Sequence, residues 1–170
     1  HENSRKRLES EQFIELVGRR TEAYPKDGLP KITFKNSMSF HYNEEIINIF
    51  HVDRAHTDGD AIIHFSKSNV LHMGDVFVRY VFPFIDEPNG GNINGMIRTL
   101  DKAADLSDGE TKIIPGHGPI STKQDLLDYR NMLITIRDRV KVQVKAGKTL
   151  NDIIASNPTR GYEGSEFVSK

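Results

Sequence analysis

The chain has 170 residues, which is enough for one domain with a substantial core and too few to favour two. Its net charge is -1, with 36% apolar and 28% charged residues, so neither nucleic acid nor an anionic membrane surface is indicated as a partner. No apolar run reaches the length of a membrane span. The sequence contains no cysteine, which excludes disulfides and thiolate chemistry and leaves the compartment undetermined.

The first half of the chain is dominated by predicted strands. Residues 1–20 are charged and carry only a weak helical stripe, and residues 24–30 form a loop with two prolines and a glycine. From 31 to 42 apolar residues alternate with polar ones, which predicts a half-exposed strand or hairpin. The more continuous run 45–52 predicts a buried strand, and 61–65 and 69–73 predict two short strands with a tight connection. The helical stripe consists of Leu8, Phe13, Leu16, Val17. The alternating set consists of Ile32, Phe34, Met38, Phe40, Tyr42.

The second half alternates helices with one more strand. Residues 82–92 predict a loop, 93–104 a helix with one apolar face, and 111–115 a strand. A capping box of Ser121 and Gln124 opens a long helix that Gly147 ends. A short helix over 149–156 follows, and the chain from Pro158 is polar. The buried stripe of the long helix is expected to be Leu126, Tyr129, Leu133, Ile136, Val140, Val144. This order of elements predicts a mixed α/β fold.

Three stretches of the sequence share one pattern, in which an apolar strand is followed by a glycine and a side chain that can bind a metal. "NIFHVDRAHTDGD" carries His56, "VLHMGD" carries Asp75 after Gly74, and "TKIIPGHG" carries His117 between two glycines. Loops at strand ends are where sites are commonly built, and glycine lets a ligand approach the backbone closely. The imidazole of His117 is therefore expected to be presented to a ligand.

Two histidines and an aspartate suit a borderline divalent ion. Zinc takes imidazole and carboxylate ligands, and iron or manganese accept the same set. Such an ion lowers the pKa of bound water toward neutrality and so generates hydroxide. Other polar residues have structural interpretations. Asp58 and Asp60 can be turn residues that hydrogen-bond their own backbone, Asp86 and Asn89 loop formers, and His51, His64, His72 packed strand residues.

"AHTDGDAIIHF", "VLHMGDVF" and "TKIIPGHGPI", in that order, resemble the later motifs of the metallo-β-lactamase-fold hydrolases. The stretch "GGNINGMIRTLDKA" and the long helix after "PGHGP" are similar to a bacterial subgroup of that superfamily. The resemblance implies an αββα sandwich of two similar halves with two metals at one edge. It implies that His56 binds the first metal, His117 the second, and that Asp75 bridges both. The implied activity is hydrolysis of an ester, thioester, lactam or phosphoester by a metal-bound hydroxide.

The sequence departs from this family in one important respect. The family's first motif, His-x-His-x-Asp-His, occurs nowhere in the chain, and "AHTDGD" differs from the "GHTPG" of the glyoxalase II branch. We therefore expect half of the αββα sandwich, a mixed sheet with helices packed on one face, and the second half of the family fold. Residues 1–158 would form this partial domain and 159–170 a polar tail. Zinc binding is expected to be weak or absent, and the chain is expected to be inactive alone.

Half a sandwich leaves one apolar sheet face without its partner sheet. We expect a homodimer or higher oligomer that buries these faces against each other. Two functions remain open on the sequence alone, beside a generic α/β domain with accidental motifs, which His56, Asp75 and His117 lying far apart in the fold would favour. The chain either derives from a metal-dependent hydrolase and needs a complementing half, or it is a metal-free α/β module for binding or oligomerisation with relic ligands.

Overall fold

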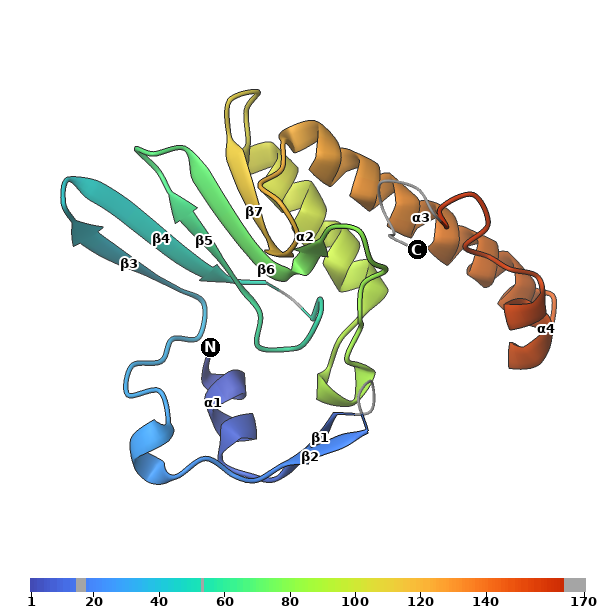
Figure 1. Cartoon of the computed structure of the whole chain (residues 1–170), viewed down its shortest axis with the longest axis horizontal. Coiled ribbons are helices and arrows are strands. Elements are labelled where there is room, and N and C mark those ends of the chain that lie inside the picture. Colours follow the sequence, from blue (N-terminus) through green and yellow to red (C-terminus); the bar gives the residue numbers. More distant parts are fainter. Residues whose placement is uncertain (15–17, 53, 164–170) are drawn as a thin grey trace.

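The computed structural model describes residues 1–14, 18–52 and 54–163. Its centre is a five-stranded mixed sheet in the order β3–β4–β5–β6–β7 (Figure 1). The strands are β3 (Ser37–Tyr42), β4 (Glu45–His51), β5 (Ala61–Phe65), β6 (Val70–Val78) and β7 (Lys112–His117). Neighbouring strands from β3 to β6 are antiparallel, and β7 runs parallel to β6. The expected mixed α/β fold is confirmed.

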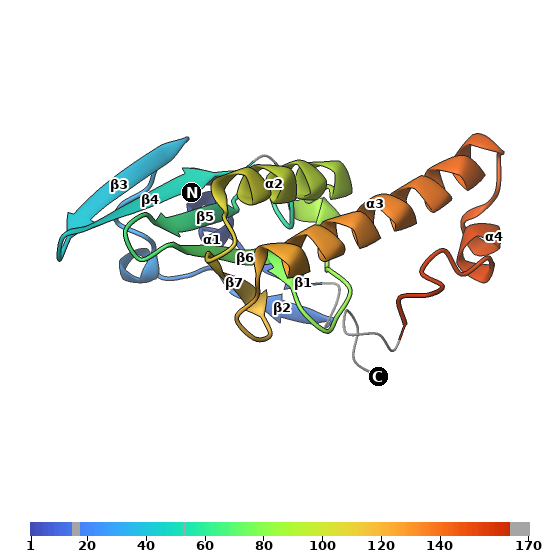
Figure 2. The same ribbon diagram turned by 90° about the horizontal axis from the view of Figure 1, so that it is seen from above.

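The parallel connection from β6 to β7 passes through α2 (Ile93–Leu106), as parallel strands require a crossover. Asn92 caps this helix by accepting hydrogen bonds from two backbone N–H groups of its first turn. The long helix α3 (Lys123–Lys145) follows β7 and leads to α4 (Leu150–Ala155). Both views show the C-terminal half of α3 and all of α4 extending away from the sheet (Figures 1 and 2). This explains why Val144, expected in the buried stripe of α3, is 58% exposed.

The two faces of the sheet differ sharply in burial. On the face that packs against the helices, Ile62, Leu71 and Ile113 are fully buried and join side chains of α2 and α3 in one core. The strand registers place a second apolar set on the opposite face, which we call the open sheet face. Its side chains are only half-buried or exposed: Met38, Phe40, Ile47, Ile49, Ile63, Phe65, Val70. The expectation of helices on one side and an apolar face on the other is therefore correct.

The N-terminal segment differs from the expected helical stripe. Helix α1 (Glu2–Leu8) ends early, and Phe13 lies in β1 (Gln12–Ile14), which pairs with β2 (Arg19–Thr21). Leu16 and Val17 lie outside the described residues. Phe13 remains 53% exposed, so the helical periodicity did not mark a buried helix face. Among the described residues, the loops include two short 3-10 helices, η2 (Lys26–Gly28) and η3 (Glu87–Asn89).

Three boundaries also differ from the sequence prediction. The alternating pattern from residue 31 becomes a strand only at Ser37, and β6 continues five residues beyond the predicted 69–73, to Val78. The capping box of α3 consists of Thr122 and Asp125, one residue later than Ser121 and Gln124, because Thr122 caps the backbone N–H of Asp125. Of the predicted tail 159–170, the described part ends at Glu163. No helix in the described ranges is long and apolar enough to cross a membrane.

Candidate metal centre

His56 lies in the loop that follows β4 and is half-buried. Its Nδ1 lies 2.8 Å from the carbonyl oxygen of Phe84. A carbonyl only accepts hydrogen bonds, so Nδ1 carries the proton and donates it. In the neutral form of the ring, the free electron pair is then on Nε2, which lies 3.7 Å from Oδ2 of Asp75. A histidine held in this way by a backbone carbonyl has the tautomer and orientation of a metal ligand.

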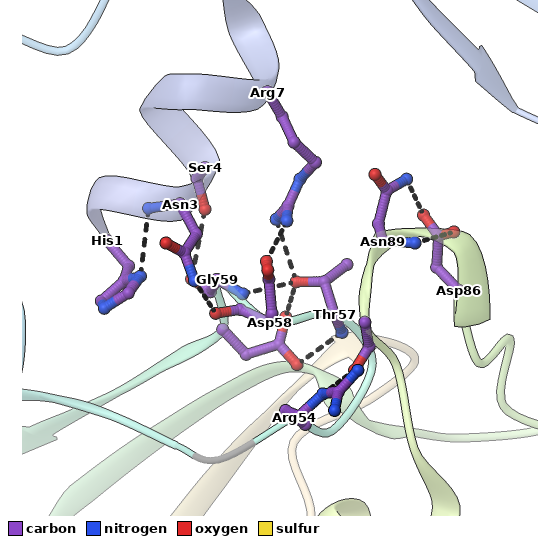
Figure 3. A network of polar contacts seen from close by, with 12 residues as sticks. His1, Asn3, Ser4, Arg7, Arg54, Thr57, Asp58, Gly59, Asp86 and Asn89 are labelled. Atoms are coloured by element: carbon purple, nitrogen blue, oxygen red, sulfur yellow. Dashed lines mark hydrogen bonds and ion pairs between the residues drawn. The ribbon is translucent and has the colours of Figure 1, made fainter.

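The loop around His56 is tied to α1 by a network of polar contacts (Figure 3). Arg7 reaches from the helix to the carboxylate of Asp58 and donates to Oγ1 of Thr57 at 3.2 Å. Asp60 accepts from the backbone N–H of Thr57 at 2.9 Å and from its hydroxyl at 2.6 Å. The turn interpretation is thus confirmed for Asp60, whereas Asp58 bonds mainly to the N-terminal helix. These contacts fix the backbone on the C-terminal side of His56.

A second contact of this loop comes from η3. The backbone N–H of Asp58 donates to the carbonyl of Asn89 at 2.9 Å, and the side chain of Asn89 donates to Asp86 at 2.7 Å. The N–H of Asp86 in turn donates to the carbonyl of His56 at 3.0 Å. Asp86 and Asn89 are loop formers, as expected. They connect the loop of His56 to the segment that follows β6.

Asp75 lies inside β6 and not beyond its end, which corrects the prediction for this strand. The pairing of β6 with β7 shifts on both sides of Gly74, whose φ of +53° only glycine adopts readily. This irregularity leaves the Asp75 side chain 41% exposed at the end of the regular sheet. A Cβ on the neighbouring Gly116 would collide with Oδ1 of Asp75, so the glycine of β7 makes room for the carboxylate.

His117 is the last residue of β7 and pairs with Val78. Its carbonyl accepts a hydrogen bond from the N–H of Arg79 at 2.8 Å, which holds the backbone, while its side chain is 71% exposed. Nε2 lies 3.3 Å from Oδ1 of Asp75. The chain leaves the strand through Gly118, which has a φ of +109°. The glycines that flank His117 therefore present its imidazole instead of burying it, as the sequence predicts.

The structure brings the three predicted residues together around one carboxylate. Each oxygen of Asp75 faces a different imidazole, Oδ2 toward His56 and Oδ1 toward His117. Two ligands of one tetrahedral zinc ion stand about 3.4 Å apart, which is close to the observed 3.7 and 3.3 Å. Among the described residues, no three His, Cys, Asp or Glu side chains are placed to hold one ion. Each imidazole therefore has Asp75 as a neighbouring donor, and the described residues provide no complete three-donor site.

The remaining histidines of the strands do not belong to this group. The ring of His51 stacks on His1 at 3.8 Å, and its Nδ1 lies 2.8 Å from the carbonyl of Asp60. His72 accepts from the N–H of Gly74 at 3.2 Å through its Nδ1. These two residues have the packing role that the sequence analysis expects, and His64 is half-buried within β5.

An apolar cleft of about 550 Å³ opens beside the three residues. Its walls are His56, Asp75, Val78, Val81, Phe82, Pro83, Phe84 and His117. The sequence predicts only a loop for residues 82–84, and it predicts neither this wall nor the carbonyl of Phe84 as the partner of His56. A signal for the wall is the apolar "VFPF" at 81–84, which follows β6 after Arg79 and Tyr80, where a surface loop is usually polar.

Comparison with known proteins places this arrangement in a fold. No family model and no curated protein sequence matches the chain. Solved structures do match, and one is the B3 metallo-β-lactamase BLEG-1, with 27% identity and a TM-score of 0.52. The match covers 70% of this chain and 55% of that protein.

Two further solved structures are similar in fold. A metallo-β-lactamase from Pontibacter korlensis has 15% identity and a TM-score of 0.51 over 62% of this chain and 49% of its own. The sec-alkylsulfatase Pisa1 from Pseudomonas sp. has 17% identity and a TM-score of 0.56 over 89% of this chain and 24% of its own. The chain thus spans about half the length of the two β-lactamases and about a quarter of the sulfatase. It is a protein of the metallo-β-lactamase fold, with the mixed sheet and helices of a half domain.

Proposed function

We propose that this chain carries part of the active site of a metal-dependent hydrolase that acts on an ester, thioester or lactam substrate. The observation that supports this most directly is the shared carboxylate of Asp75, with one imidazole at each oxygen, at the mouth of an apolar cleft. The solved structures of similar fold include metallo-β-lactamases and a sulfatase, which are hydrolytic enzymes by their names.

In this proposal His56 and Oδ2 of Asp75 would hold one ion, and His117 and Oδ1 the other. Zinc is the first choice, and iron or manganese accept the same donors. A divalent ion in such a site lowers the pKa of bound water and polarises the bond to be cleaved. The chain's own contribution is positional. The Phe84 carbonyl keeps the proton on Nδ1 of His56, and the apolar walls exclude bulk water from the substrate.

The described residues supply two donors for each ion, whereas a catalytic zinc site normally has three protein ligands. We infer that the isolated chain binds metal weakly and needs further ligands from another polypeptide segment for activity. This agrees with the length of the β-lactamases of similar fold, of which the chain spans about half.

The test is the metal content per chain, measured by elemental analysis of protein purified without chelator or affinity tag. Half-filled sites predict a detectable zinc content below one ion per chain that falls to background in His117→Ala. The matched control is His41→Ala, an exposed histidine of β3. Equal zinc content in wild type and both variants would show that the metal sits elsewhere and would overturn the proposal.

A second function from a different class is favoured by the open sheet face. As a metal-free module, the chain would use this face for oligomerisation, and the ligands would be relics. Several large apolar side chains lie on the open sheet face, and one of them, Phe40, is 43% exposed. Metal content at background in the wild type, together with a stable oligomer, would favour this reading over the hydrolase.

A further inference from the structure

The cleft beside Asp75 has a chemical character that the proposed hydrolase activity does not by itself explain. Apart from the three candidate ligands, every residue that lines it is apolar: Val78, Val81, Phe82, Pro83, Phe84. Within the described ranges, the lining includes no lysine or arginine and no carboxylate other than Asp75. In the metal-free chain, a carboxylate or phosphate on a bound molecule would lose water there without meeting a lysine or arginine.

Arg79 is the one cationic residue close in sequence to residues 81–84, and its side chain has structural partners elsewhere. Arg79 is 8% exposed, and its guanidinium forms an ion pair with Asp125 at 2.6 Å, at the start of α3. Its Nη1 also reaches Ser121 Oγ at 3.4 Å. A buried arginine with these partners is a structural anchor and is not available to bind an anionic substrate.

The apolar wall is held at both ends and is therefore preformed. At its start, Arg79 is anchored as described, and Tyr80 turns the chain with a φ of +66°, which is unfavourable for a bulky residue. At its end, the N–H of Asp86 bonds to the carbonyl of His56 at 3.0 Å. Between them, Phe82 packs against the core and Phe84 meets the His56 ring edge to face, with centroids 5.9 Å apart.

The wall and the candidate metal ligand are thus one structural unit, since Phe84 contributes both a ring to the cleft and the carbonyl that orients His56. We infer that residues 81–84 are a specificity-determining wall that accepts an uncharged, apolar acyl or alkyl group of the substrate and rejects an anionic one. This inference rests on the proposed function in taking the bound molecule to be a substrate, but the binding preference itself needs neither metal nor turnover.

The experiment compares two small probes of equal chain length on the full, chelator-treated chain. Hexanamide is neutral, and adipamate carries a carboxylate at the far end. Binding is followed by the backbone amide signals of Val81, Phe82 and Phe84 in ¹H–¹⁵N NMR spectra. We expect hexanamide to shift these signals and to bind about ten-fold more tightly than adipamate, which corresponds to ~1.4 kcal/mol.

Two variants decide whether residues 81–84 cause the preference. Val81→Lys, at a side chain that is 44% exposed and tolerates a charge, should reverse it in favour of adipamate. The matched control Val142→Lys, on the exposed surface of α3, should leave it unchanged. Phe82→Ser should weaken hexanamide binding.

The inference is overturned if wild type binds both probes equally, if Val81→Lys changes nothing, or if hexanamide shifts the signals of β3 and β4 in place of those of the cleft. The metal content is measured on separate protein purified without chelator, and it is independent of these readings. If the chain binds no metal but keeps the probe preference, the inference about the apolar wall stands and the proposed hydrolase function fails. If the chain binds metal but shows no preference, the inference about the wall fails and the proposed function stands.

Discussion

Gly116 and Asp75 come from neighbouring parallel strands and touch where the pairing of β6 with β7 becomes irregular. The carboxylate occupies space that any larger residue at position 116 would fill, because an added Cβ would collide with Oδ1 and with the backbone of Gly74. The glycines of "GHG" thus have separable tasks. Gly116 makes room for the shared ligand, and Gly118 lets the chain turn away after His117.

Gly116→Ala is therefore expected to displace Asp75 and to destabilise the fold by about 1–3 kcal/mol, as overpacking does. Its zinc content should fall together with its stability. Gly109→Ala is the matched control, because Gly109 has open space around its missing Cβ. Urea denaturation measures both variants, and equal midpoints for them would contradict this description of the site.

The sequence singles out the three candidate residues, because Asp75 and His117 stand next to glycines after apolar runs and His56 lies three residues before Gly59. The structure places their side chains close together, and their role as metal ligands stays a prediction. What could not be predicted is how they are oriented. The carbonyl of Phe84 lies 28 residues from His56 in the sequence, and Arg7 contacts Thr57 across a separation of 50 residues. A backbone acceptor such as this carbonyl carries no sequence signal.

At the scale of elements, the turn between β5 and β6 depends on a carboxylate from a third strand. Glu45, at the start of β4, accepts hydrogen bonds from the backbone N–H groups of Lys67 and Ser68 and from the Ser68 hydroxyl at 2.7, 2.9 and 2.6 Å. The hydroxyl of Ser68 is the largest cause that lowers the pKa of Glu45 from 4.5 to about 2. One side chain thus links two neighbouring hairpins of the sheet.

A carboxyl group whose pKa is lowered by folding stabilises the native state above its unfolded pKa, and this contribution is lost as the pH falls through the folded value. For Glu45 the window runs from pH 4.5 down to about 2. Glu45→Gln should be less stable than wild type at pH 6, and the difference should shrink as the pH falls through this window. Glu44→Gln is the control, since Glu44 makes one exposed ion pair with Lys67. Urea midpoints between pH 6 and 3 that run parallel for wild type and Glu45→Gln would contradict the prediction.

The apolar periodicity of the sequence predicts whether each larger element is a helix or a strand, but it does not predict where the element begins and ends. Strand β6 continues through Gly74 and Asp75 because β7 pairs with it beyond the apolar run, and this tertiary pairing overrides the glycine as a stop signal. Both Ser121 and Thr122 can cap a helix, and the partner at the third helical position distinguishes them. Helix α3 begins after Thr122 because Thr122 and Asp125 form the capping box. In the N-terminal segment the helical stripe was too weak to compete with the β1–β2 hairpin.

For the whole molecule, the open sheet face is the main departure from an ordinary soluble domain. Contiguous apolar patches of this kind mark association surfaces, and two sheets of similar twist can pack face to face. A second copy of this chain offers a face of the same chemistry, which is the condition for an isologous dimer. We therefore propose that the isolated chain is a homodimer through this face.

Sedimentation velocity at micromolar concentration should show a dimer for the wild type. Phe40→Glu, in the middle of β3, places a charge on the open sheet face and should shift the chain toward monomer. Val142→Glu changes an apolar residue on α3 that is more exposed than Phe40, and it should leave the dimer intact. A wild type that sediments as a monomer, or a dimer that survives Phe40→Glu and not Val142→Glu, would place the interface elsewhere.

The central claim is that one carboxylate serves two imidazoles, and the most direct test follows both histidines at once. Addition of Mn²⁺ to the chelator-treated chain should broaden the ring C–H signals of His56 and His117 in NMR spectra and leave that of His41 sharp. Asp75→Asn should abolish the broadening at both rings together. If Asp75→Asn leaves either ring signal as broad as in the wild type, the two histidines do not depend on a shared ligand and the account of the site is wrong.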